Sequence, residues 1–376
     1  MKKILLVFGT RPEAIKMAPV VRQLKEHNNA VVTRVCVTAQ HRHLLDQVLG
    51  FFEIVPDFDL DIMKSGQDLF DITAGVILGI KKVLKEERPD IVVVQGDTTT
   101  SFVTALAAFY EGIAVAHIEA GLRTYNLKAP FPEEANRQII SRLAQIHLAP
   151  TQLNKQSLLS EGVPEKNIFV TGNTVVDAIQ WARQTIKTRP SNYYYSILQE
   201  AAKPFVEDKP IILVTGHRRE SFGPGFHRIC RALRSIAERN PEVNLIYPVH
   251  PNPNVKKPVY DMLGKLKNFF LIEPLEYEPF VFLMDRSVLI LTDSGGIQEE
   301  APSLKKPLLV MRDLTERREA VDAGVALLVG TDEQKIIFET ERLLNDANYY
   351  RSIANHDNPF GDGKAAQRIY EILKDW

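Results

Sequence analysis

Three carboxylates stand where a sheet of parallel strands would bring them together. Asp97 lies in the turn after the apolar run 91–94, and Glu119 comes directly after the run 114–118. Glu133 opens a predicted helix soon afterwards. Two of them have a plainer explanation, since Asp97 could cap a helix and Glu133 could simply favour a helix N-terminus. Together they predict a site for general acid–base chemistry, because ligands bind at the carboxyl ends of parallel strands.

A basic turn follows the first apolar run. Gly9 permits a tight turn, Pro12 suits a first helical turn, and the unpaired N–H groups of a helix N-terminus attract an anion. Arg11 and Lys16 add formal positive charge beside it. The alternative is an ordinary turn with surface basic residues. The string is not the GxGxxG fingerprint of a dinucleotide site.

Basic side chains also follow strands in the second half of the chain. His217, Arg218 and Arg219 combine a tunable proton donor with fixed positive charge, which suits a diphosphate. A solvated basic turn is the alternative. His250 ends a later strand, where a packed histidine is as good an interpretation as a ligand. Arg317 offers one more positive charge after a further strand.

The strongest single motif is a pair of glycines after an apolar strand. Gly295 and Gly296 follow Ser294, so a phosphate could approach the backbone N–H groups at the start of the next helix. Glu300, about one helical turn later, could accept hydrogen bonds from ribose hydroxyls. A plain glycine-rich turn is the alternative.

Several enzyme classes lack their sequence signatures here. The histidines have no regularly spaced partners for a metal ion. The sequence contains no Walker A string, no nucleophile elbow and no HExxH motif. We therefore do not expect a metal hydrolase, a P-loop ATPase or a serine hydrolase.

Continuous apolar runs alternate with helical patterns along nearly the whole chain. Such runs are typical of parallel strands buried on both faces, and helices such as 69–87 and 226–239 lie between them. The expected strands are 4–8, 31–37, 91–94, 114–118, 146–149, 168–170, 211–215, 244–248, 269–272, 288–291, 308–311 and 326–329. We predict an α/β fold of two Rossmann-like parallel-sheet domains facing a central cleft.

The length of 376 residues also favours two domains. We place an N-terminal domain, with the carboxylates, at residues 1–172 and a C-terminal domain at 173–363. The last helix, 364–376, could close the second domain or return to complete the first.

Composition excludes some partners. With 46 basic and 47 acidic residues, the net charge of −1 gives no global attraction to nucleic acid or an anionic membrane. No apolar run approaches the roughly 18 residues of a membrane span, and the first run is better explained as a buried strand than as a signal peptide. Cys36 and Cys230 lie far apart in apolar contexts. They predict reduced thiols and a cytoplasmic protein.

In order along the chain, these segments resemble the bacterial non-hydrolysing UDP-N-acetylglucosamine 2-epimerases. The matching strings are FGTRPEAIKMAP, TAQHR, QGDTTT, HIEAGLRT, PEEANR, TGNTVVDA, TGHRRESFG, YPVHPNPNV and LTDSGGIQEEAP, and they cover essentially the whole chain. The resemblance implies a glycosyltransferase-B-like architecture, a homodimer, and the ligands UDP-N-acetylglucosamine, UDP-N-acetylmannosamine and UDP. It implies no cofactor, neither a metal nor a nicotinamide.

The resemblance also implies roles for particular residues. Around the sugar and diphosphate it places Arg11, Lys16, Asp97, Glu119 and His217. Around the nucleotide it places the Leu275 backbone, Phe280, Ser294, Gly295, Gly296, Glu300 and Arg317, and His250 is a further substrate-binding candidate. The expected catalytic residues are Asp97, Glu119, Glu133 and His217.

The implied reaction explains why such residues are needed. No carbonyl acidifies the C2 hydrogen of the sugar, so direct deprotonation would be slow. In the family route UDP leaves C1 while C2 loses its proton, giving 2-acetamidoglucal, and UDP re-adds after protonation on the opposite face. The product would supply surface polysaccharide synthesis.

The sequence departs from the family pattern at several positions, among them 65–67, where an arginine of some relatives is missing. Arg318 stands where many relatives have proline. Some relatives bind a second UDP-N-acetylglucosamine as an activator near a segment that corresponds here to Gln40, His41 and Arg42. His43 replaces a glutamine found in some of those relatives, so activation is not strongly indicated.

Three other functions remain open. A hydrolysing epimerase would release free N-acetylmannosamine and UDP. A retaining glycosyltransferase would share the diphosphate site but would need an acceptor. A non-catalytic nucleotide-sugar sensor would not need all the expected acid–base residues.

Overall fold

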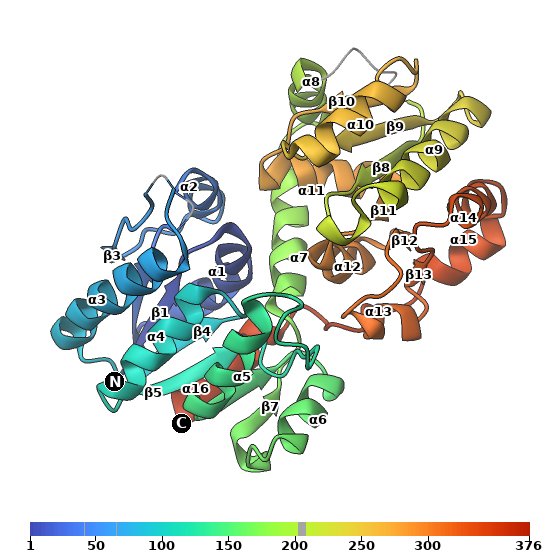
Figure 1. The fold of residues 1–376 in the computed structure, drawn as a ribbon. Helices are drawn as coiled ribbons and strands as arrows, with labels where there is room; N and C mark the ends of the chain where they lie inside the picture. The colour runs from blue at the N-terminus through green and yellow to red at the C-terminus, as the bar shows by residue number, and fades with distance from the viewer. Residues whose placement is uncertain (41, 65, 202–207) are drawn as a thin grey trace. The chain divides into compact units, whose positions relative to one another are not determined.

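The chain folds into two compact α/β units (Figure 1). A computed structural model describes residues 1–40, 42–64, 66–201 and 208–376. The first unit contains Met1–Ala178 together with Phe360–Trp376, and the second contains Ile179–Pro359. The backbone therefore passes from one unit to the other twice. In the described part of the chain, no helix has both the length and the apolar character needed to cross a membrane.

The first unit is built on a seven-stranded parallel sheet of order β3-β2-β1-β4-β5-β6-β7. Its strands are β1 (Lys2–Phe8), β2 (Val31–Val37), β3 (Phe58–Asp59), β4 (Ile91–Gln95), β5 (Ala114–Ile118), β6 (Ile146–Ala149) and β7 (Ile168–Val170). All but β3 were predicted. A two-residue strand at the sheet edge is too short to produce a hydrophobic pattern.

Helices cover both faces of this sheet. They are α1 (Arg11–Glu26), α2 (Arg42–Phe51), α3 (Leu69–Glu87), α4 (Thr99–Tyr110), α5 (Glu133–Leu143), α6 (Gln152–Ser160), η1 (Glu165–Asn167), α7 (Thr174–Ile186) and α16 (Ala365–Asp375). Helices α3, α4 and α5 lie side by side on one face. Their inner sides bury an apolar core against β1, β4 and β5. Helix α1 packs against α2 and α16.

The C-terminal helix is held against the first unit by specific contacts. The carboxylate of Asp177 on α7 accepts hydrogen bonds from the N–H groups of Ala365 and Ala366, at 3.2 and 2.9 Å. Burial is the main cause that raises the pKa of Asp177 to about 6. On α1, the ring of His27 stacks on Tyr370 with centroids 4.1 Å apart.

The second unit contains a six-stranded parallel sheet of order β10-β9-β8-β11-β12-β13. Its strands are β8 (Ile211–Thr215), β9 (Asn244–Pro248), β10 (Phe269–Ile272), β11 (Ser287–Thr292), β12 (Leu308–Val310) and β13 (Ala326–Leu328). All six were predicted, three with the same bounds. All but β13 are largely buried, which explains their mainly apolar sequences.

The helices of this unit alternate with its strands. They are α8 (Ser191–Ala201), η2 (Arg219–Ser221), α9 (Pro224–Arg239), α10 (Pro253–Leu263), α11 (Tyr277–Arg286), α12 (Gly295–Glu300), η3 (Ala301–Leu304), α13 (Arg318–Asp322), α14 (Glu333–Asn345) and α15 (Ala347–Ala354). Helices α9 and α14 pack together, and α9 also contacts α10. In both units the turns after parallel strands carry the polar clusters described next.

Candidate active site

Two of the predicted carboxylates follow adjacent strands of the first sheet. Strand β4 pairs with β5 in parallel, with Val94 opposite His117 and Gln95 opposite Ile118. The turn after β4 contains Asp97, and Glu119 directly follows β5. The sheet therefore brings both backbone positions to the same end of neighbouring strands, as the sequence predicted.

Glu119 is held between a cation and an amide. The Nζ atom of Lys16 on α1 forms an ion pair with its carboxylate, and both side chains are nearly buried. The Nε2 group of Gln95 donates a second hydrogen bond to the same carboxylate oxygen, at 2.9 Å. The backbone of Glu119 has a φ of 65°, a left-handed conformation that a non-glycine residue adopts at a cost of roughly 1–3 kcal/mol. Such local strain is common at functional sites.

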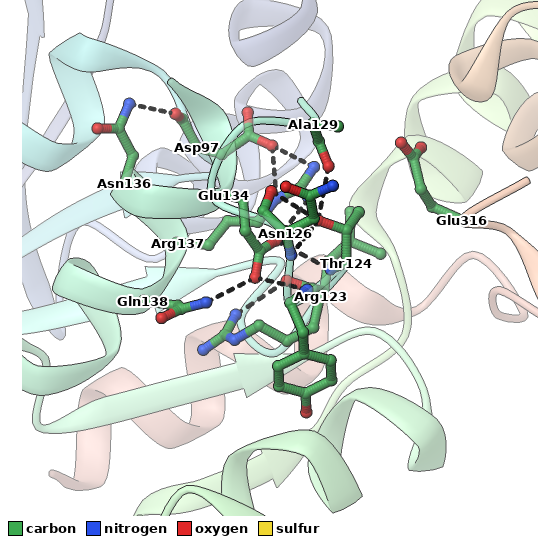
Figure 2. A network of polar contacts seen from close by, with 12 residues as sticks. Asp97, Arg123, Thr124, Asn126, Ala129, Glu134, Asn136, Arg137, Gln138 and Glu316 are labelled. Carbon is green, nitrogen blue, oxygen red and sulfur yellow. Dashed lines mark hydrogen bonds and ion pairs between the residues drawn. The ribbon is translucent and has the colours of Figure 1, made fainter. Parts of the chain in front are cut away.

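Asp97 is held from helix α5 (Figure 2). The guanidinium of Arg137 contacts its Oδ2 atom at 2.8 Å from Nε and 2.7 Å from Nη2. The side-chain amide of Asn136 donates to the backbone carbonyl of Asp97 at 2.8 Å. The alternative role of Asp97 as a helix cap is not what the structure shows, because Thr98 caps α4.

The two acidic residues at the start of α5 have different environments. Glu134 is fully buried, and its carboxylate accepts hydrogen bonds from the N–H groups of Thr124 and Tyr125 at 2.9 and 3.1 Å. Burial acts to raise the pKa of Glu134, but these bonds and those from Gln138 and Arg137 outweigh it and lower the pKa. Glu133 is different, because its Oε2 atom is buried without a hydrogen-bond partner in the described residues.

The basic turn after β1 is organised by a buried carboxylate that the sequence analysis did not single out. Glu13 accepts hydrogen bonds from the N–H groups of Gly9 and Thr10 at 3.0 and 2.8 Å. Its other oxygen accepts from the hydroxyls of Thr98 and Ser101 at 2.6 and 2.9 Å. Burial raises the pKa of Glu13, although these bonds oppose it. Glu13 thus ties the turn that carries Arg11 to the turn that carries Asp97.

A second buried carboxylate organises the basic turn after β8. Asp293, which follows β11, accepts the N–H groups of His217 and Arg218 on one oxygen at 2.7 and 2.8 Å. Its other oxygen lies 3.6 Å from Nδ1 of His217. The imidazole of His217 also stacks on that of His250, with ring centroids 5.1 Å apart. The structure therefore brings the two predicted histidines together.

The glycine-rich turn lies against the predicted arginine. Ser294 is the N-cap of α12, and a Cβ atom added at Gly295 would lie 3.2 Å from Cζ of Arg317. The guanidinium of Arg317 is oriented by Glu299 and Glu316, each at 2.9 Å. A side chain at position 295 would crowd the guanidinium, so the glycine gives Arg317 room at this turn.

The predicted nucleotide residues lie on or near α11 and α12. The hydroxyl of Tyr277 donates to the Glu300 carboxylate at 3.2 Å, and both side chains are buried. Burial raises the pKa of Tyr277 well above its ordinary value. Leu275 and Phe280, which flank the start of α11, are half-buried. Tyr277 was not predicted, since a lone tyrosine has no distinguishing spacing.

The segment linked with activation in some relatives is only partly described. His41 lies outside the described residues. The hydroxyl of Thr100 donates to the Gln40 side chain at 3.4 Å. Arg42 forms ion pairs with Asp46 and Asp59. Gln40 and Arg42 therefore both have polar partners within the described residues.

The structure adds several side chains to the predicted set. They contact the predicted residues, the turns that carry them, or one another: Glu13, Gln95, Glu134, Arg137, Tyr277, Asp293 and Glu299. Most of them fall within the strings that carry the family resemblance. Across residues 1–40, 42–64, 66–201 and 208–376, no three His, Cys, Asp or Glu side chains are grouped so that they could hold a metal ion.

Known proteins share this sequence and fold. A family model described as UDP-N-acetylglucosamine 2-epimerase matches residues 22–374. The UDP-N-acetylglucosamine 2-epimerase of Yersinia pestis is 57% identical over 373 residues, covering 99% of this chain and 98% of the relative. That of Escherichia coli (strain K12) is 56% identical over 373 residues, with the same coverage.

Solved structures agree. The crystal structure of the UDP-GlcNAc 2-epimerase from Neisseria meningitidis bound to UDP-GlcNAc is 50% identical, covers 100% of both chains and has a TM-score of 0.92. The Methanocaldococcus jannaschii enzyme, in complex with UDP-GlcNAc and UDP, is 35% identical over 100% of both chains, with a TM-score of 0.83. These likenesses and the two parallel sheets confirm the predicted glycosyltransferase-B-like α/β fold. The chain belongs to the UDP-N-acetylglucosamine 2-epimerases, a family of isomerases.

Proposed function

We propose that this protein interconverts UDP-N-acetylglucosamine and UDP-N-acetylmannosamine without releasing the free sugar. The observation that carries the proposal is the pair of carboxylates, Asp97 and Glu119, at the ends of adjacent strands, each held by a cation. Family membership supplies the substrate class, since the Neisseria meningitidis relative was solved with UDP-GlcNAc bound.

The reaction is an elimination followed by an addition. A base removes the C2 proton, the C–H electrons form the C1–C2 double bond, and the C1–O bond breaks with its electron pair leaving on UDP. An acid then protonates C2 of the 2-acetamidoglucal on the opposite face, and the UDP oxygen re-forms its bond to C1. Asp97, Glu119 and Glu133 are the proposed acid and base groups.

Positive groups would stabilise the departing diphosphate. We assign this role to Arg11 and Lys16 on the first unit and to His217 and Arg317 on the second. Arg317 is pre-oriented by Glu299, and the His217 turn by Asp293, so little reorganisation is needed during reaction. Preorganised charges of this kind are usually a large contribution to catalysis.

The nucleotide is assigned to the second unit. Ser294, Gly295 and Gly296 would contact phosphate, and Glu300 would accept the ribose hydroxyls. The Leu275 backbone and Phe280 would contact uracil, with His250 beside His217. This assignment is supported by the position of all these groups after the strands or at the helix starts of one sheet.

Incubation with UDP-N-acetylglucosamine in deuterated water tests the proposal. Proton exchange at C2 should give UDP-N-acetylmannosamine that carries deuterium at C2, detected by NMR and mass spectrometry. A product with its original C2–H bond would overturn the mechanism. Free N-acetylmannosamine as the main product would instead identify a hydrolysing epimerase, and consumption that requires an acceptor would identify a glycosyltransferase.

We also infer that two copies of the chain associate through α3 and α4. Phe70 and Leu78 on α3 and Phe109 and Tyr110 on α4 are exposed, and the two helices pack side by side. Large exposed apolar side chains on two neighbouring helices are a feature of protein interfaces. A second copy is the occupant that the family resemblance implies.

A cytoplasmic location is the third part of the proposal. Cys36 and Cys230 are both free and buried. Burial raises the pKa of each thiol to about 12, so neither is a reactive thiolate at neutral pH. Two inert thiols fit a reducing compartment.

A further inference from the structure

The guanidinium of Arg137 joins two carboxylates in the first unit. It contacts Asp97 through Nε and Nη2 and Glu134 through Nη1, the latter at 3.2 Å. The side chains of Arg137 and Glu134 are 6% and 0% exposed, whereas that of Asp97 is 23% exposed. The buried pair thus supports a carboxylate that is still partly exposed. The three side chains lie together at the start of α5 (Figure 2).

The contact between Arg137 and Asp97 is asymmetric. The Nε and Nη2 atoms of Arg137 contact the same oxygen of Asp97, Oδ2, at 2.8 and 2.7 Å. No hydrogen bond or ion pair to Oδ1 occurs within the described residues. One oxygen of Asp97 is therefore fixed by a bifurcated charge-assisted contact, while the other remains available to a substrate.

The support behind Arg137 is itself fixed. Glu134 binds the N–H groups of Thr124 and Tyr125, and its pKa is lowered by its hydrogen bonds in spite of burial. It therefore stays ionised and balances part of the charge of Arg137. Asn136, on the same helix, holds the backbone carbonyl of Asp97. Helix α5 thus fixes both the main chain and one side-chain oxygen of Asp97.

We propose that Arg137 is a positioning residue for the epimerisation, which holds Oδ2 so that Asp97 exchanges a proton with C2 of the sugar only through Oδ1. The inference rests on the proposed function. In each direction a proton passes between C2 and Oδ1, and Arg137 neither gives nor takes one. A displacement of the reacting oxygen by about 1 Å can cost about a hundredfold in rate, which is the effect expected when this support is lost.

The decisive variants change the support and leave Asp97 in place. For R137Q, kcat should fall about a hundredfold, while KM and the Kd for UDP stay within about threefold of wild type. R137K, which keeps the charge but offers one donor group in place of a fork, should be intermediate. For R137A, added guanidinium at non-denaturing concentration should restore at least about tenfold of the lost kcat, since it can occupy the space that the side chain left.

A matched control is a second buried arginine of the same unit. Arg123 is 1% exposed and contacts Glu161 through Nε and Nη2 at 2.7 and 2.9 Å, with no contact to Asp97, Glu119 or Glu133 within the described residues. R123Q removes a comparable ion pair, so it should lower the midpoint of thermal unfolding about as much as R137Q does. For the variant R123A, added guanidinium should not raise kcat.

Two results would overturn the inference. One is a kcat for R137Q within about threefold of wild type, or no larger a loss than for R123Q, since either would reduce Arg137 to a structural ion pair. The other is the absence of guanidinium rescue in folded R137A. If R137A does not fold, equal kcat values for R137K and R137Q would count against the proposal, and a higher value for R137K would support it. Failure of the proposed function is distinct, because wild-type protein would then incorporate no deuterium at C2.

Discussion

At the scale of residues, the site depends on groups that hold other groups. Lys16 and Gln95 both contact Glu119, and Arg137 contacts Asp97. Glu133 alone of the three carboxylates has a buried oxygen without a hydrogen-bond partner in the described residues. The three groups therefore begin from different environments, which is what opposite roles on the two faces of C2 require.

Replacement of the carboxylates should separate chemistry from binding. D97N and E119Q keep the shape of each side chain and remove its ability to act as a base. We expect kcat to fall at least about a hundredfold in each, because general acid–base groups contribute about 10²–10⁴-fold. The Kd for UDP, measured by calorimetry, should stay close to that of wild type.

Normal turnover in both variants would show that the acid–base assignment is wrong. D46N is a suitable control, because Asp46 is partly exposed on α2 and pairs with Arg42 rather than with any of the three carboxylates. Its kcat should be unchanged.

Glu13 offers a second prediction at this scale. Its carboxylate accepts hydrogen bonds from two backbone N–H groups and two hydroxyls. In E13Q the NH2 group of the glutamine cannot accept, so it would face one pair of these donors without a hydrogen bond. The free energy of unfolding should fall by about 1–3 kcal/mol, measured by urea denaturation. Because the turns that carry Arg11 and Asp97 lose their link, kcat should fall as well.

The control for this variant is on the same helix. Glu26 is half-exposed and pairs with Arg22 at i,i+4, so E26Q should change the free energy of unfolding by less than about 0.5 kcal/mol. Equal effects of E13Q and E26Q would contradict the role given to Glu13.

The sequence predicted the reacting residues better than their supports. Asp97 and Glu119 could be placed because each lies just beyond the end of a strand, and adjacent strands bring such positions together. Arg137 and Asp293 could not be assigned partners, since their contacts span 40 and 76 residues and have no local pattern. The functional roles of all these groups remain predictions.

At the scale of elements, burial explains what was predicted. Strands covered on both faces need apolar residues at most positions, and most of the twelve predicted strands were continuous apolar runs in the sequence. The edge strand β3 (Phe58–Asp59) is two residues long and half-exposed, so it has no such run. Helix α7 (Thr174–Ile186) crosses from the first unit into the second at Ala178, which no turn residue in the sequence marks.

Close packing behind Glu119 gives an element-scale prediction. Gly121 has a φ of 92°, and a Cβ atom there would lie 2.2 Å from the backbone oxygen of Asn154 on α6. A backbone atom cannot move aside easily, so G121A should lower the free energy of unfolding by more than about 2 kcal/mol.

The matched change is G50A in α2. Nothing lies within 4 Å of a Cβ atom at Gly50, and the residue is helical. Alanine there should raise stability by up to about 1 kcal/mol, since it reduces the entropy of the unfolded chain. Urea denaturation of both variants checks the pair, and a stable G121A protein would contradict the steric argument.

The junction between α7 and α16 should respond to pH. Burial raises the pKa of Asp177 from 3.8 to about 6, so the folded state binds this proton more tightly than the unfolded state does. The resulting stabilisation is fully present below about pH 4 and is lost as the pH rises through about 6. The midpoint of thermal unfolding of wild type, relative to that of D177N, should therefore be higher at pH 5 than at pH 7.5. A difference that does not vary with pH would show that Asp177 does not titrate in this range.

At the scale of the whole molecule, the fold class and two-unit organisation could be predicted because strands and helices alternate throughout. From the sequence, a homodimer could be inferred only through the family resemblance. An apolar residue of a helix cannot be assigned to the surface or to the core from sequence alone. The structure distinguishes them, because Phe70 and Leu78 are on the outer side of α3 while Val76 and Ile80 are buried.

The proposed homodimer can be tested by charge. L78D and F109D place charges on the exposed face of α3 and α4, and both should shift the mass measured by light scattering from dimer to monomer. F338D is the control, because Phe338 is equally exposed on α14 of the second unit. A wild-type protein that is monomeric at micromolar concentration would contradict the inference.

The double passage of the backbone has a consequence for synthesis on the ribosome. The first unit is interrupted after Ala178 and resumes at Phe360, so its closing helix α16 is translated only after the whole of the second unit. The second unit is a continuous stretch and can complete its sheet while the first still lacks a helix that covers α1. During that interval an apolar surface of the first unit stays uncovered and could aggregate. A premature stop codon between Pro359 and α16 would leave the second unit whole and damage the first.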